Sequence, residues 1–97
     1  MQWIKHLYDL CAHFGYKWTN PLIHNHDGLV IFEWMSSNRR LNIYSSRKDD
    51  SCWYLKSWGP DTNKQMEEGL FETEKMLGLY LWVNQIQEKG KQNESKT

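Results

Sequence analysis

His24, His26 and Asp27 form the one cluster of residue types in this sequence that suits a metal ion. Two imidazoles and a carboxylate can hold zinc when a further ligand comes from elsewhere, and here His13 or Cys11 would have to supply it. The sequence has no Cys-x-x-Cys pair and no His-Glu-x-x-His motif. A polar loop in which Asp27 makes a turn explains the same residues. We therefore expect no bound metal, and keep a metal-dependent hydrolase built on these three side chains as an alternative.

Other catalytic patterns are missing from the sequence. The six glycines are scattered, so there is no glycine-rich phosphate loop, and no Gly-x-Ser-x-Gly element is present. Cys11 and His13 stand two residues apart on an expected helix and would not face each other. Glu67 and Glu68 are interpreted as solvated charges on a loop. The sequence predicts a protein that is not an enzyme and that needs no cofactor.

Three short runs rich in β-branched and aromatic residues predict an antiparallel meander. They read LVIFEWM from Leu29, RLNIYS from Arg40 and CWYLKSWG from Cys52, and polar turn residues separate them. Side chains alternate between the two faces of a strand, so the apolar sets are assigned to the core. A slip of one residue in a strand would exchange its two faces. The residues predicted to face the core are Val30, Phe32, Trp34, Leu41, Ile43, Trp53 and Leu55.

The opposite face of the meander would then combine aromatic rings with cations, and it is the predicted partner-binding site. Such a composition suits a protein–protein hot spot, and it also resembles the stacking platforms that hold single-stranded nucleic acid. A helix, the chain's own tail or a second copy of the chain could instead cover the face. Twelve basic and twelve acidic residues give a formal net charge of zero, which places nucleic acid behind a protein partner. The predicted site residues are Arg40, Tyr44, Tyr54, Lys56 and Trp58.

One amphipathic helix is expected before the meander and one after it. Residues 2–14 carry apolar side chains at helical spacing, and Gly15 follows as a stop signal. Thr73 is the expected N-cap of the second helix. The connection over residues 16–28 is expected to tuck Trp18, Leu22 and Ile23 against the core, and residues 61–69 are expected to form a polar loop from which Met66 reaches it.

Length and composition describe a single small domain. The chain has 97 residues, of which 39% are hydrophobic and 25% charged, as in ordinary globular proteins. We predict an α+β fold over residues 1–87, with both helices on one face of a three-stranded antiparallel sheet, and a disordered polar tail over residues 88–97. No apolar run is long enough to cross a membrane, and no secretory signal is evident. Two cysteines, expected to be reduced, complete a prediction of cytoplasmic localisation.

The segment from Phe32 to Gly69 resembles a pattern of small uncharacterised bacterial α+β proteins. In these proteins an aromatic-rich meander ends in Lys-x-Trp-Gly, and a Met-Glu-x-Gly step and a helix follow. The matching runs are FEW, RRLNIY, YLKSWGP and MEEG. The resemblance covers about two-fifths of the chain. It implies the fold and carries no assigned activity.

The sequence therefore predicts a non-catalytic intracellular module that acts by occupying the surface of a partner protein. Antitoxins, immunity proteins and phage-encoded inhibitors of host defence nucleases are proteins of this kind. A nucleic-acid-binding module using the same sheet face is the alternative. A homodimer remains open, and no membrane association is expected.

Overall fold

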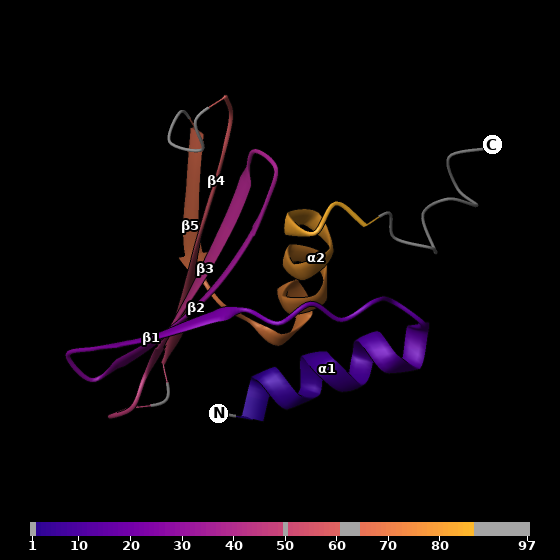
Figure 1. The fold of residues 1–97 in the computed structure, drawn as a ribbon. Helices are drawn as coiled ribbons and strands as arrows, with labels where there is room; N and C mark the ends of the chain where they lie inside the picture. The colour runs from indigo at the N-terminus through magenta and orange to yellow at the C-terminus, as the bar shows by residue number, and fades with distance from the viewer. Residues whose placement is uncertain (1, 50, 61–64, 87–97) are drawn as a thin grey trace.

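The computed structural model describes residues 2–49, 51–60 and 65–86, which form one helical layer on one side of an antiparallel sheet (Figure 1). The tail predicted over residues 88–97 lies outside the described residues. Helix α1 spans Gln2–Phe14 and α2 spans Thr73–Val83. The five strands follow one another in the sheet in chain order: β1 (Leu22–His26), β2 (Leu29–Ser36), β3 (Arg39–Ser46), β4 (Cys52–Trp58) and β5 (Gln65–Leu70).

The α+β class is confirmed, whereas the three-stranded sheet is a wrong prediction. Strands β1 and β5 extend the meander at both edges, over segments that were predicted to be loops. Leu22, Ile23 and Met66 were expected to reach the core, but 61%, 57% and 57% of their surfaces are exposed. Among the described elements, α2 packs on β2 and β3, and α1 reaches β2 through the contact of Trp3 with Phe32. The edge strands therefore have no helix above them to bury their side chains.

Two tight turns set the register of the sheet. Asp27 and Gly28 join β1 to β2 with φ angles of 50° and 80°, the left-handed pair of a type I′ turn. Ser37 and Asn38 join β2 to β3 where a hairpin was predicted, and Ser37 has a φ of 55°. The residues that flank such a two-residue turn form a hydrogen-bonded pair. These turns thereby fix both the face of each side chain and the direction of each backbone N–H.

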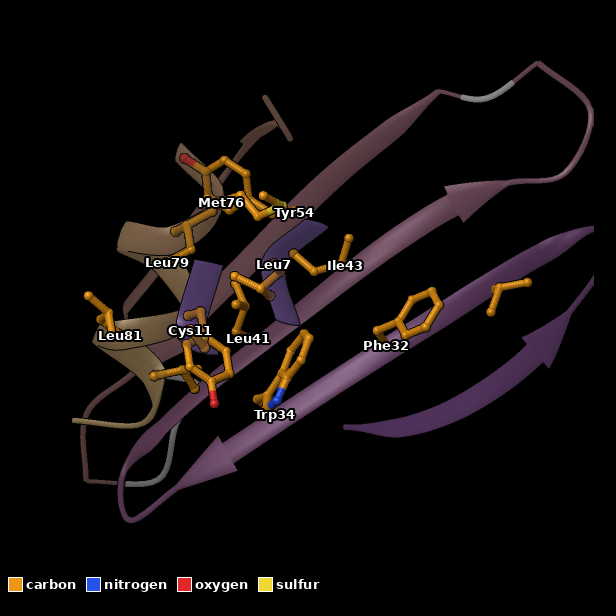
Figure 2. Close-up of a cluster of buried hydrophobic side chains, with 13 residues drawn as sticks. Leu7, Cys11, Phe32, Trp34, Leu41, Ile43, Tyr54, Met76, Leu79 and Leu81 are labelled. Carbon is orange, nitrogen blue, oxygen red and sulfur yellow. The ribbon is translucent and has the colours of Figure 1, made fainter. Parts of the chain in front are cut away.

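The core lies between the helices and the inner face of the sheet (Figure 2). The predicted core residues of β2 and β3 are confirmed: Val30, Phe32, Trp34, Leu41 and Ile43 are each at most 5% exposed. The assignment of β4 is wrong by one residue. Ile43 stands opposite Tyr54 and Tyr44 stands opposite Trp53, so Tyr54 faces the helices. Its exposure is 4%, and Trp53 and Leu55 belong to the other face.

Tyr80 of α2 anchors the connection that follows α1. Its hydroxyl donates to the Lys17 carbonyl at 2.7 Å and accepts from the Thr19 N–H at 2.8 Å. Its ring stacks on Trp18 at 5.3 Å, and Trp34 donates from Nε1 to the Thr19 carbonyl at 2.9 Å. The connection after α1 is thus anchored to α2 and β2, as predicted for Trp18.

The ends of the helices follow the sequence closely. Gly15 has a φ of 78°, and the Tyr16 N–H donates to the Cys11 carbonyl at 2.8 Å, which is the Schellman arrangement. At the start of α2 the prediction is off by one residue. Glu72 is the N-cap, and its side chain makes no capping hydrogen bond.

Gly78 offers a test of the exposed side of α2. A Cβ added at this position would meet nothing within 4 Å. We expect Gly78→Ala to raise the free energy of unfolding by about 0.5–1 kcal/mol, because alanine costs less conformational entropy in a helix. Urea denaturation would show a higher midpoint with an unchanged slope. Gly69→Ala is the contrasting variant, since its Cβ would lie 3.2 Å from the Tyr54 ring and should lower stability. A destabilised Gly78→Ala would contradict the open position of this residue.

Candidate functional site

The structure separates the five predicted site residues onto two faces of the sheet. Arg40 and Tyr44 lie on the side away from the helices, as predicted. Tyr54, Lys56 and Trp58 lie on the helix side, because Lys56 stands opposite the buried Leu41. The five side chains therefore do not form one surface. The cause is the one-residue slip in β4.

We call the side of the sheet opposite the helices the outer face. No described helix lies over it (Figure 1). The register assigns every second residue of each strand to it. Its members are Leu22, His24, His26, Leu29, Ile31, Glu33, Met35, Arg40, Asn42, Tyr44, Ser46, Trp53, Leu55, Ser57, Met66, Glu68 and Leu70.

Much of the outer face is apolar and accessible to solvent. Seven large hydrophobic residues of the described chain are highly exposed, and four of them lie here: Leu22, Met35, Met66 and Leu70, at 55–67%. A row of apolar residues crosses the sheet through Ile31, Tyr44, Trp53 and Leu70, which are paired in the register. The rings of Tyr44 and Trp53 stack at 5.5 Å with an angle of 7° between their planes. Sequence reasoning missed Trp53 and Leu70, because it placed the first in the core and the second outside any strand.

A fixed pair of charges stands within this apolar surface. The Glu33 carboxylate lies 3.1 Å from Arg40 Nε and 3.7 Å from His24 Nε2. Arg40 Nε is buried, and despite this short distance it makes no aligned hydrogen bond. The guanidinium also contacts the Met35 sulfur, 3.5 Å from Nη2. About a third of the Arg40 side chain remains exposed, so donor groups are left for an incoming acceptor.

Lys56 and Trp58 are occupied by the protein itself on the other face. The Lys56 ammonium lies 4.7 Å from the ring centroid of Trp82, 5.6 Å from that of Trp58 and 3.9 Å from the Glu67 carboxylate. Arg39 lies over the same Trp82 ring at 5.2 Å and donates to its carbonyl at 2.7 Å. These contacts hold the C-terminal end of α2 against the sheet, which is a structural use of cation–π attraction.

The metal candidates are divided between two separate histidine–carboxylate contacts. His24 faces Glu33, and His26 lies 3.3 Å from the Asp27 carboxylate in an exposed position. The described residues contain no group of three or more His, Cys, Asp or Glu side chains placed to hold a metal ion.

The two cysteines lie in α1 and β4. Both are free thiols, and Cys11 is 1% exposed. Burial raises the pKa of the Cys11 thiol and so disfavours the reactive thiolate.

A cavity of about 530 Å³ lies where β2 extends beyond the start of β1. Thr19, Trp34 and Asn84 form part of its wall. These groups are bonded to one another, since Thr19 Oγ1 donates to Asn84 Oδ1 at 2.8 Å and Trp34 donates to the Thr19 carbonyl. Most of their donors and acceptors are thus already hydrogen-bonded within the protein.

In comparisons with known proteins, no family model, curated protein or solved structure matches the chain. Among the described residues, no helix is both long and apolar enough to cross a membrane.

The buried phenol of Tyr54 yields a prediction about pH. Its hydroxyl donates to Glu67 Oε2 at 2.7 Å, and this hydrogen bond, burial and the nearby carboxylate raise the pKa of Tyr54 to about 12. The folded-state pKa lies above the unfolded value near 10, so this contribution to stability is complete below pH 10 and is lost as pH rises to about 12. Residue-resolved NMR titration of the tyrosine ring would measure the pKa.

Glu67→Gln should lower the pKa of Tyr54 toward its ordinary value. Glu68→Gln is the matched control, since this neighbour lies on the outer face and should leave the titration unchanged. Burial also raises the pKa of Tyr80, so the two signals have to be assigned separately. An unshifted Tyr54 in the unmodified protein would contradict the contact with Glu67.

Proposed function

We propose that the protein is a non-catalytic protein-binding module and that the outer face of the sheet is its docking surface. The observation that carries this proposal is the concentration of exposed apolar residues on a sheet face over which no described helix lies. Apolar patches of this kind on small domains are typical of interaction surfaces. The partner we infer is a protein with a complementary apolar surface and an acceptor group for Arg40.

The stacked pair of Tyr44 and Trp53 would be the anchor of such an interface. Aromatic side chains bury about 150–250 Å² each and lose little conformational entropy when their position is already set. The parallel stacking of the two rings sets that position before binding. Leu22, Met35 and Leu70, each more than half exposed, would supply the surrounding apolar contact.

Glu33 and Arg40 would orient the partner more than they would hold it. A pair of charges that is already formed adds little net affinity, but it penalises a partner whose charges are misplaced. Among the outer-face residues, Arg40 is the only lysine or arginine, and Glu33 partly neutralises it. With two carboxylates, Glu33 and Glu68, against this single cation, the outer face has no basic excess. This favours a protein partner over the nucleic-acid alternative, which depends on phosphate contacts.

Occupying a partner's surface is the mode of action we propose, as in antitoxins, immunity proteins and phage-encoded inhibitors of defence nucleases. The proposal rests on the surface, and it is supported by the lack, among the described residues, of a group of side chains that could hold a catalytic metal ion. Two free thiols fit a reducing compartment, so we propose a cytoplasmic location.

A charged double variant tests the docking surface. Met35→Glu with Leu70→Glu places carboxylates on the apolar surface at positions whose exposure of 55% and 67% should let the domain fold. We expect partner affinity to fall by about thirtyfold or more, as for loss of a hot spot worth roughly 2 kcal/mol. The measurement is capture from a lysate with the unmodified chain, followed by titration calorimetry of the purified partner against each variant.

Tyr8→Glu serves as the control, since Tyr8 is 50% exposed on α1, away from the outer face. It should retain the partner. Loss of the captured protein from both variants, or from neither, would refute the outer face as the docking surface. Recovery of nucleic acid that dissociates at high salt would favour the alternative function instead.

A further inference from the structure

Strand β1 forms an edge of the sheet and buries none of its side chains. All five residues from Leu22 to His26 are exposed, although they are fully paired to β2 on one side. Within the described residues β1 has a strand neighbour on that side only. A strand with one open side presents unpaired N–H and C=O groups that can pair with a further strand.

The two tight turns identify the backbone groups that point outward. His26 and Leu29 flank the turn at Asp27-Gly28 and form a hydrogen-bonded pair. Hydrogen bonding alternates along an antiparallel ladder, so Leu22, His24 and His26 bond to β2. The Arg47 N–H donates to the Gly28 carbonyl at 3.0 Å. This bond on the β3 side of the chain agrees with the alternation, since it leaves Leu29 to bond to β1. The N–H and C=O groups of Ile23 and Asn25 therefore face away from the sheet.

The two edges of the sheet differ in how they discourage pairing. Strand β5 carries Glu67 and Glu68, and charged residues are a common protection of edge strands. Strand β1 reads Leu-Ile-His-Asn-His, with no lysine, arginine, carboxylate or proline. Leu22 and Ile23 are exposed on its opposite faces, at 61% and 57%. A further strand placed along β1 would cover both of these side chains at once.

We propose that β1 pairs antiparallel with β1 of a second copy of this chain, about a two-fold axis at His24. In this register Ile23 faces Asn25 of the second copy, and Asn25 faces its Ile23. Each of these pairs exchanges both of its outward N–H and C=O groups. Shifting the axis to Ile23 would bring Asn25 opposite Pro21, which has no N–H to donate.

Side-chain chemistry agrees with the same register. Leu22 faces His26 of the second copy, and the two His24 side chains face each other on the outer face. Like charges directly opposite each other destabilise cross-strand pairing, and this register opposes no pair of like permanent charges. An isologous contact of this kind closes on itself and yields a dimer.

The dimer would cover Leu22 but leave the rest of the docking surface free, since Met35, Tyr44, Trp53 and Leu70 lie on other strands. A two-fold axis perpendicular to the sheet keeps both outer faces on the same side, so the dimer presents two copies of the proposed surface side by side. A partner with two sites would then bind with increased avidity. The pairing itself rests on β1 alone and does not require the proposed function.

Sedimentation equilibrium of the full chain, from micromolar to millimolar concentration, tests this pairing. We expect a monomer–dimer equilibrium, weak because the contact consists of two short strands. Ile23→Pro removes an outward N–H without touching the β1–β2 bonds and should weaken the dimer by about tenfold or more, since the symmetric contact loses the bond twice. Glu68→Pro is the matched control. The same alternation of hydrogen bonds, carried across the sheet to β5, leaves the Glu68 N–H facing outward on that edge. It should leave the dimer constant unchanged.

Two charge variants test the dimer independently if Ile23→Pro folds poorly. One variant carries lysine at Leu22 and His26, and the other carries glutamate at both positions. Each should stay monomeric alone, because like charges are opposed twice, and an equimolar mixture of the two should form a heterodimer.

A chain that is monomeric up to millimolar concentration would overturn the proposal. A dimer that resists Ile23→Pro, or a mixture of the charge variants that stays monomeric, would overturn it as well. A dimer that survives Ile23→Pro and is lost in the Met35→Glu, Leu70→Glu variant would show association through the outer face. That result also separates failure of this inference from failure of the proposed docking function.

Discussion

The register set by the two tight turns determines which residues of β1, β2 and β3 face the helices and which face away from them. Because the turn at Asp27-Gly28 has two residues, His26 and Leu29 must pair, and the turn at Ser37-Asn38 likewise pairs Ser36 with Arg39. Side chains then alternate without interruption along β2 and β3, and the same alternation orients the N–H groups. One geometric constraint therefore produces the helix-covered face, the outer face and the open edge of β1.

The sequence predicted the parts of the fold in which burial leaves a pattern. In β3 the polar Asn42 separates Leu41 from Ile43, and in β2 Glu33 separates Phe32 from Trp34. The core assignments of both strands are confirmed by Phe32 and Ile43, at 4% and 1% exposure. Strand β4 gives a weaker pattern, since Trp53 and Tyr54 are adjacent aromatics and either could face the helices. The known register of β3 would have shown which of the two faces the helices if the length of the following turn could be predicted. Residues 47–50 carry no turn signal strong enough for that. Tyr54, Lys56 and Trp58 were consequently assigned to the wrong face together.

Strands β1 and β5 were missed for a different physical reason. A strand is recognised in a sequence mainly by the face it buries, and every residue of β1 is exposed. Backbone pairing to β2 holds it in place, and such pairing leaves no mark on side-chain composition. In β5 the signal is the glycine: a Cβ at Gly69 would lie 3.2 Å from the Tyr54 ring, so the aromatic residue covers its cross-strand neighbour. The run Met66-Glu67-Glu68-Gly69 thus has a structural use, since Glu67 also accepts the Tyr54 hydroxyl.

The six tryptophans divide between the two sides of the sheet. Trp3, Trp18 and Trp34 contact one another or Tyr80 on the helix side, and Trp58 and Trp82 meet at its far end. Five of the six are therefore used to attach two short helices to a sheet, which a domain of this size achieves with few large side chains. Trp53 alone lies on the outer face, stacked on Tyr44. Since the helical layer needs no contribution from it, Trp53 is the one tryptophan that we propose as a contact for a partner protein.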